Sequence, residues 1–361
     1  MKIRSALEKL SRKDYKEESS PVHENILDCN LGVNSFGTSD KVLECAKQFN
    51  WSDLNLPPDN SYKQLKKEIM RFWSDYADIK FENIKIANGS SVVLSRINKI
   101  FIESGVRVLG YIPQFTEFMM EVAVLGGYYE GIPLTPEENL KFNPDILLRA
   151  MKKDHFLVYI DNPNNPTGQL INICDIEIVV KEASKKDITI IVDEAYGDYV
   201  MEKYSAINLI NKYKNLIVTR TFTKGYGIGF TRVGYAILST ELSGCYSKIE
   251  LPFPVSSFGA ELAREALSDH EFVVNLRNKV RAVKGTLINE LMKLGYIISE
   301  THKSCPIFII NHKDNHTDFK ELLQGKGIIT KPGTDFEGLD KNYVRINTPA
   351  SAIDFLNRFQ T

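Results

Sequence analysis

The sequence has few cysteines, no long apolar run and almost no net charge. Its 361 residues contain five scattered cysteines: Cys29, Cys45, Cys174, Cys245 and Cys305. An odd number without paired spacing predicts neither a disulfide framework nor a zinc site, and it favours a reducing compartment. No stretch approaches the length of a membrane span, and residues 1–20 carry charges of both signs without the apolar core of a signal peptide. We therefore expect a cytoplasmic protein that does not span a membrane.

The charge balance also excludes some partners. Lysine and arginine number 45 against 46 acidic residues, which gives a net charge of −1. Proteins that bind nucleic acid or anionic membranes generally carry a strongly positive surface, so we expect neither partner. Hydrophobic residues make up 43% and charged residues 25% of the chain, as is ordinary for a globular protein. The length suits one large domain and a smaller one.

Three apolar runs near the middle of the chain predict neighbouring strands. They cover residues 157–160, 188–192 and 216–219 and are rich in β-branched side chains. Continuous apolar runs bounded by turn residues are typical of strands buried on both faces of a parallel sheet. Further strands alternating with helices are expected before and after them, so the pattern predicts an α/β domain.

Polar residues follow each of these runs. The first run leads into Asp-Asn-Pro-Asn-Asn-Pro-Thr-Gly, which includes Asn165. The second leads into Asp193 and Tyr196, and the third into Lys224, with Arg232 eight positions later. In open α/β sheets ligands bind at the carboxyl ends of the strands. We therefore expect these five side chains to converge on one crevice.

This combination of side chains fits the chemistry of pyridoxal phosphate (PLP). The Lys224 amine can form a Schiff base with the cofactor aldehyde. A carboxylate such as Asp193 favours the protonated pyridine ring, which then serves as an electron sink. Asn165 and Tyr196 can bind the phenolic oxygen, and the Arg232 guanidinium can bind the phosphate.

Each motif also has a purely structural interpretation. The Asn-Pro segment consists of turn formers, Asp193 can cap a helix, and Lys224 can be a solvated surface lysine. The occurrence of all three motifs in order, each at the end of a predicted strand, favours the cofactor interpretation.

The ordered motifs resemble those of fold-type I PLP-dependent enzymes, in particular class I/II aminotransferases similar to histidinol-phosphate aminotransferase. The resemblance implies a large PLP-binding α/β domain with a mostly parallel sheet, over residues 41–250, and a small α+β domain over residues 251–361. It also implies an N-terminal arm, residues 1–40, that packs with the small domain. Pro252 and Pro254 mark the domain boundary, because two prolines cannot continue an ordinary helix or central strand.

The resemblance assigns more residues to the cofactor. Its phosphate is expected to be held by Ser90, Ser91, Thr221, Thr223 and Arg232. Phe115 is expected to stack on the pyridine ring. Tyr62 is expected to reach the phosphate of a neighbouring subunit, which implies a homodimer with composite sites. The structural alternatives are that the serines only cap a helix and that Tyr62 packs on its own chain.

Substrate residues are also implied by the resemblance. Arg345 is expected to grip a carboxylate or phosphate, with a surface ion pair as the alternative. Asn34, Asn165 and Lys331 complete the expected substrate site. Three positions depart from the family pattern: Lys331 replaces a frequent arginine, Cys305 a usual asparagine, and Phe230 a usual glycine. We therefore expect an ordinary amino acid to be preferred over histidinol phosphate.

The implied function is a PLP-dependent aminotransferase that moves an amino group between an amino acid, or a similar amine, and a 2-oxo acid. The mechanism is ping-pong, with Lys224, Asp193 and Tyr196 as the catalytic residues. A decarboxylase similar to threonine-phosphate decarboxylase, or a PLP-dependent cyclase or oxidase, has the same motifs and stays open. A PLP-binding regulator is a more distant alternative, because residues 1–30 are too short for a DNA-binding domain.

Two other patterns are set aside. Gly225-x-Gly227-x-Gly229 lacks the spacing of a dinucleotide loop. His312 and His316, with Cys305 nearby, lack a fourth zinc ligand. We therefore expect no metal site.

Overall fold

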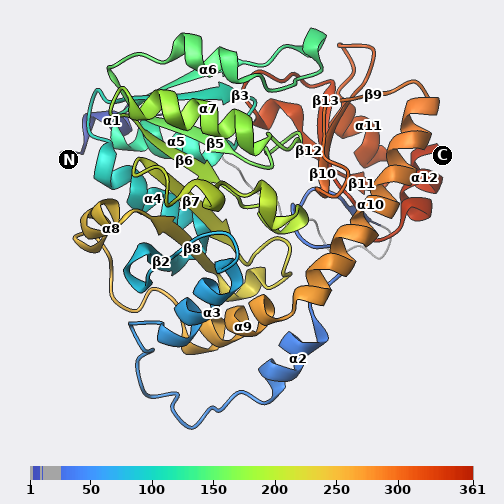
Figure 1. Cartoon of the computed structure of the whole chain (residues 1–361). Helices are drawn as coiled ribbons and strands as arrows, with labels where there is room; N and C mark the ends of the chain where they lie inside the picture. The colour runs from blue at the N-terminus through green and yellow to red at the C-terminus, as the bar shows by residue number, and fades with distance from the viewer. Residues whose placement is uncertain (1–2, 9, 11–25, 361) are drawn as a thin grey trace.

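The computed structural model describes residues 3–8, 10 and 26–360. Its largest sheet has seven strands and lies in the large unit (Figure 1). The strand order is β2-β8-β7-β6-β5-β3-β4. Neighbours from β7 to β4 run parallel, whereas β8 runs antiparallel to both β7 and β2. The strands are β2 (Ile84–Asn88), β3 (Arg107–Ile112), β4 (Tyr128–Pro133), β5 (His155–Asp161), β6 (Thr189–Asp193), β7 (Leu216–Thr221) and β8 (Val233–Leu238).

The central strands are buried on both faces, as their continuous apolar sequences predict. Every residue of β6 and β7 is buried. Successive side chains of a strand point to opposite faces. In β6, Ile190 and Val192 therefore join one hydrophobic cluster while Ile191 joins the other. Each such buried side chain stabilises the fold by about 1.5–3 kcal/mol.

Helices cover both faces of this sheet. One face carries α4 (Gly89–Phe101), α5 (Thr116–Leu125) and α8 (Thr240–Ser247). The other carries α3 (Lys63–Trp73), α6 (Pro144–Ala150), α7 (Ile173–Ser184) and α9 (Ser257–Ser268), with α2 (Asp40–Lys47) beside α9. Short 3-10 turns lie at η1 (Phe81–Asn83), η2 (Pro136–Glu138), η3 (Gly197–Tyr199), η4 (Glu202–Tyr204), η5 (Ala206–Leu209), η6 (Gly229–Thr231) and η7 (Gly333–Asp335).

The second unit is a small α+β lobe with its own core. Its antiparallel sheet has the order β12-β13-β10-β9. The strands are β9 (Ile297–Ile298), β10 (Ile307–Asn311), β12 (Lys331–Pro332) and β13 (Tyr343–Asn347). A separate parallel pair joins β1 (Leu27–Asp28) to β11 (Ile328–Ile329). The helices are α10 (His270–Lys293), α11 (Phe319–Gly325) and α12 (Ala352–Gln360).

The boundary between the units differs from the one expected at residue 251. Helix α9 packs against α2 and α3, and its Leu262, Ala263 and Ala266 belong to the core of the large unit. The prolines lie in the loop before α9, so they interrupt a helix-to-helix connection within the large unit. The long helix α10 follows α9 and contacts both η3 and α12.

Only part of the N-terminal arm packs with the small domain as expected. Helix α1 (Ser5–Glu8) contacts α5 of the large unit, while β1 pairs with the small lobe. Residues 1–2, 9 and 11–25 of this arm lie outside the described residues. In the part of the chain that is described, no helix is long and apolar enough to cross a bilayer.

Candidate active site

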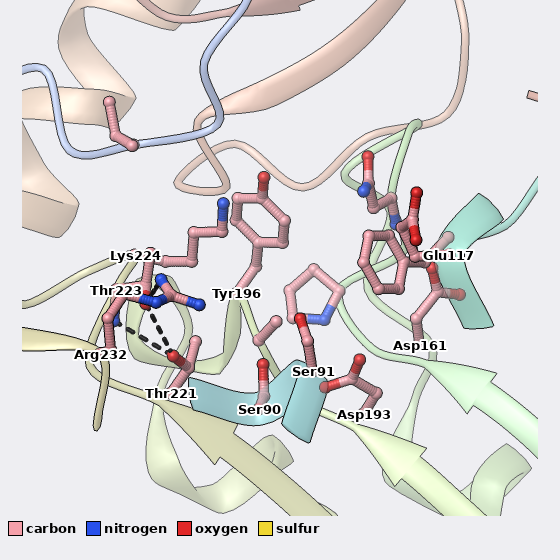
Figure 2. Close-up of a pocket in the computed structure, with 15 residues that line it drawn as sticks. Ser90, Ser91, Glu117, Asp161, Asp193, Tyr196, Thr221, Thr223, Lys224 and Arg232 are labelled. Carbon is pink, nitrogen blue, oxygen red and sulfur yellow. Dashed lines mark hydrogen bonds between the residues drawn. The ribbon is translucent and has the colours of Figure 1, made fainter. Parts of the chain in front are cut away.

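A cavity of about 330 Å³ lies where β5, β6 and β7 end (Figure 2). Its walls bring together most of the residues predicted from the sequence: Ser90, Ser91, Phe115, Asn165, Asp193, Tyr196, Thr221, Thr223, Lys224 and Arg232. These side chains come from the ends of β6 and β7, from separate loops and from the start of α4. They meet because the parallel strands end at one edge of the sheet.

One end of the cavity is built to bind an anion. Ser90 and Ser91 stand in the first turn of α4, where backbone N–H groups lack helical partners. Arg232 Nη1 donates to Thr223 Oγ1 over 3.3 Å. Gly89 has φ +80°, and a Cβ there would lie 2.7 Å from Arg232 Nη2, so only glycine allows this close approach. The guanidinium, hydroxyls and helix N-terminus together suit a phosphate group.

The opposite end holds a buried acid. Asp193 is 3% exposed; Oδ1 accepts a hydrogen bond from Thr219 (2.8 Å) and Oδ2 from the Tyr159 hydroxyl (3.0 Å). Burial raises the pKa of Asp193 from 3.8 to about 6, and the nearby Asp161 carboxylate adds to the rise. The two hydroxyl partners are neutral, so they do not compensate the negative charge of the Asp193 carboxylate. A cation bound beside Asp193 is therefore favoured. The protonated nitrogen of a pyridine ring meets this requirement.

The lysine lines the same cavity, on the side of Thr223 and Arg232 (Figure 2). Lys224 Nζ is 5.4 Å from the centre of the Tyr196 ring. A Cβ on Gly32 would lie 2.0 Å from the Tyr196 hydroxyl oxygen and 3.5 Å from Lys224 Nζ, so the backbone of residue 32 closes tightly over both. An amine, a phosphate-binding end and an acid at the far end match the aldehyde, phosphate and ring nitrogen of PLP, so the residues present fit this cofactor.

Asn165 connects the cavity to Arg345. Arg345 Nη1 donates to Asn165 Oδ1 over 2.8 Å, and Nη2 donates to the Asn30 carbonyl over 2.6 Å. Arg345 is fully buried, which excludes the alternative of a surface ion pair. The guanidinium therefore lies directly behind a residue of the cavity wall, although it does not line the wall itself.

Besides Arg345, three expected site residues lie outside the cavity wall, and each makes contacts elsewhere in the chain. The Tyr62 hydroxyl donates to the Val255 carbonyl (2.8 Å) and accepts from the Val255 N–H (2.9 Å) of its own chain, and its expected role at a neighbouring subunit's phosphate stays a prediction. Asn34 Nδ2 donates to the Gly225 carbonyl, which fixes the backbone beside the lysine. Lys331 is buried and paired with Asp335 at 2.8 Å.

Sequence reasoning missed several residues of the wall. Val33, Glu117 and Asp161 line the cavity, and Gly32 lies against the Tyr196 hydroxyl. Asp161 stands at a predicted strand end, so the argument that identified Asp193 could have identified it as well. Glu117 lies two positions beyond Phe115, in the first turn of α5. A position at the start of a helix predicts a site residue less strongly than a position at the end of a buried strand.

The two patterns set aside in the sequence have structural roles. A Cβ on Gly227 would lie 2.4 Å from the Gly37 carbonyl oxygen, and Gly227 has φ +69°, so this segment needs glycine for close packing. The His312 ring contacts the Phe319 ring at 5.6 Å between centroids. Across the described residues, no three His, Cys, Asp or Glu side chains group as metal ligands.

Comparisons with known proteins agree with this geometry. The family described as "Aminotransferase class I and II" matches residues 24–354. A histidinol-phosphate aminotransferase from Caldicellulosiruptor saccharolyticus is 30% identical over 331 residues, which cover 90% of this chain and 88% of that protein. A provisionally named threonine-phosphate decarboxylase from Caldanaerobacter subterraneus is 28% identical and covers 87% of this chain and 83% of its own length. The crystal structure of the histidinol-phosphate aminotransferase from Clostridium acetobutylicum superposes with a TM-score of 0.82 at 23% identity, over 93% of this chain and 97% of that one, and shows the same fold.

Proposed function

Because the chain belongs to the class I and II aminotransferase family, a family of PLP-dependent enzymes, we propose that it moves an amino group between an amino acid and a 2-oxo acid in the cavity described above. The observation that carries this proposal is the alignment of a lysine amine, an anion-binding end and a buried carboxylate around one cavity. Both half-reactions use the same site, so ping-pong kinetics follow.

PLP, when bound, supplies an aldehyde that accepts the amino group and a ring that withdraws electrons. Arg232, with the threonine hydroxyls and the start of α4, holds the phosphate. Asp193 keeps a proton on the ring nitrogen, and Asn165 and Tyr196 bind the phenolic oxygen. The Lys224 amine would hold the cofactor aldehyde, and in its free form it would be the general base for the proton on the substrate Cα. Arg345 receives the substrate carboxylate.

A panel of amino donors tests this function. Single-turnover conversion of PLP-loaded protein should be measured with common amino acids and with histidinol phosphate, and each 2-oxo product identified. We expect an amino acid to react fastest, because Lys331 is already paired with Asp335 and a second negative charge would be repelled there. Fastest conversion with histidinol phosphate would overturn this preference, and no conversion with any donor would overturn the proposed function.

Arg345→Ala should raise KM for amino acids much more than for the amines that lack the carboxylate. Truncating one partner of a buried charge-assisted pair costs about 2–5 kcal/mol, which is roughly 30-fold or more in KM. Arg345 also holds Asn165 and Asn30, so Tm must be measured in parallel. Arg345→Lys, which keeps the charge without the bidentate fork, is the matched control. An equal loss for amino acids and carboxyl-free amines would contradict carboxylate binding.

Decarboxylation is the second candidate, because one similar chain carries the provisional name threonine-phosphate decarboxylase. Amino transfer breaks the C–H bond at Cα, whereas decarboxylation breaks the bond to the carboxylate. The Lys331–Asp335 pair opposes a phosphorylated substrate. Release of CO₂ in the single-turnover assay, in place of a 2-oxo acid, would favour the decarboxylase.

We further propose that the protein acts in the cytoplasm as a homodimer. Its five cysteines are free thiols, as suits a reducing compartment. The proposed interface, called the loop face here, is formed by exposed apolar side chains of two segments: Trp51, Leu54, Leu56, Leu251 and Phe253. The segments are adjacent, because the Phe253 N–H donates to Asn60 Oδ1 over 2.7 Å. An apolar face of this kind is typical of a protein interface.

The loop face also approaches the cavity. Phe230, between Lys224 and Arg232 in the chain, is 91% exposed and belongs to η6. That turn packs on α9, whose Phe258 ring lies 5.4 Å from the Trp51 ring. A second chain on the loop face would therefore approach the cavity and support a composite site.

Leu56→Glu should weaken the dimer at least about 30-fold, because a carboxylate would lose water at the centre of the interface. Sedimentation velocity at several protein concentrations measures this change. Ile353→Glu is the control, since Ile353 is also strongly exposed but belongs to α12 of the small lobe. A wild-type monomer at micromolar concentration would contradict the dimer, and an unchanged Leu56→Glu dimer would contradict this face.

A further inference from the structure

Two buried acids lie side by side at one end of the cavity. Asp161 ends β5 and Asp193 ends β6, and they are partners in the parallel ladder between these strands. Each is 3% exposed and each lines the cavity (Figure 2). Only Asp193 has a role in the reaction described above. A second carboxylate in this position is costly to bury, so its partners indicate what it does.

Four neutral donors hold the Asp161 carboxylate. Oδ1 accepts from the Tyr111 hydroxyl (3.0 Å), Gln114 Nε2 (2.9 Å) and Asn164 Nδ2 (2.9 Å), and Oδ2 accepts from the Asn165 N–H (2.9 Å). A carboxyl group that only accepts hydrogen bonds is favoured in its ionised form. Burial raises the pKa of Asp161, and these four bonds oppose the rise.

The titratable groups that face Asp161 come from its own strand and from three other strands of the sheet. They are Tyr111 of β3, Tyr129 of β4, Tyr159 of β5 and Asp193 of β6. Tyrosine and aspartate side chains are either neutral or negatively charged, so none of these groups neutralises Asp161. The negative charge of Asp161 therefore adds to that of Asp193. A cation placed at this end of the cavity is attracted by both carboxylates.

Asp161 also connects this end of the cavity to the substrate side. It fixes the Asn165 backbone through the N–H, while the Asn165 side chain accepts a hydrogen bond from Arg345. The Asp161 carboxylate thus anchors Asn165, which in turn orients the Arg345 guanidinium.

We propose that Asp161 is a positioning residue of this site, which reinforces the negative charge that Asp193 offers to the ring nitrogen of PLP and anchors Asn165 toward Arg345. The inference rests on the proposed function, since it presumes that PLP binds with its ring nitrogen at Asp193.

Two variants separate the charge from the anchor. Asp161→Asn keeps the size of the side chain but removes the charge, and its amide nitrogen would face the Asn165 N–H. Asp161→Ser removes the charge and keeps an oxygen that can accept from that N–H. Both variants should bind PLP about tenfold more weakly and lose the ring-nitrogen proton about one pH unit lower, because an opposite charge has been removed. KM for amino acids should rise more in Asp161→Asn than in Asp161→Ser.

The measurements are the Kd for PLP and ¹⁵N NMR of protein loaded with PLP labelled at the ring nitrogen, followed against pH. A purely structural role would not move the pH at which the ring nitrogen loses its proton. Asp145→Asn, on the exposed surface of α6, is the control and should behave as wild type. If either folded Asp161 variant keeps a Kd within twofold of wild type and an unshifted ring nitrogen, the inference is wrong. Wild-type protein that binds no PLP would instead contradict the proposed function, and the inference with it.

Discussion

Lys224→Ala is expected to abolish the covalent attachment of PLP and to lower turnover by at least about 10⁴-fold. The same amine holds the cofactor aldehyde and transfers the proton at Cα, and general acid–base catalysis alone contributes up to about 10⁴-fold. Lys224 is the lysine that lines the cavity, together with Arg232 and Asp193. The measurement is the absorbance of the purified protein before and after borohydride reduction, followed by mass analysis of the modified peptide.

The control for this experiment is Lys181→Ala, which removes an exposed lysine from α7. That protein should stay yellow and carry the reduced label on Lys224. A label on any other lysine of the wild-type protein would refute the assignment. A Lys224→Ala protein that still forms a reducible bond would refute it equally.

Asp193→Asn is expected to retain PLP and to lose about a hundredfold or more in turnover. The amide cannot hold a proton on the ring nitrogen as the carboxylate does, and removing a preorganised charge partner commonly costs this much. Turnover should be measured at saturating PLP, with bound cofactor quantified by absorbance. Near-normal turnover would reject the role of Asp193.

Asp193→Asn is expected to lower turnover but to raise the stability of the cofactor-free protein. The pKa of Asp193 is about 6 in the folded state, above its ordinary value of 3.8, so folding favours the protonated form. The wild type therefore loses stability as pH rises from about 4 to above 6, whereas asparagine carries no charge at any pH. Cofactor-free Asp193→Asn should exceed wild type by about 3 kcal/mol in free energy of unfolding at pH 8 and by little below pH 4. Urea titrations at the two pH values measure this difference.

The sequence alone was sufficient to predict the strands and most of the cavity wall. Continuous apolar runs are a local signal, and the residue that follows a buried strand of a parallel sheet has a predictable position at the sheet edge. This is why Asn165, Asp193, Lys224 and Arg232 could be expected to meet although 67 positions separate the first from the last. The same reasoning applies to Asp161, which also follows a predicted strand, although it was not among the expected site residues.

Tertiary structure decided which of the remaining residues reach the site. Arg345 contacts Asn165 across 180 positions and Tyr62 contacts Val255 across 193, and neither pairing has a periodic or local signature. Lys331, expected as a substrate ligand, forms an ion pair with Asp335 at 2.8 Å, because β12 and η7 bring these two side chains together. Hydrogen bonds and ion pairs act over a few ångströms, so their partners are set by how the two units pack. Local sequence determines where each strand ends, whereas only the packed chain determines which side chains then come within reach of one another.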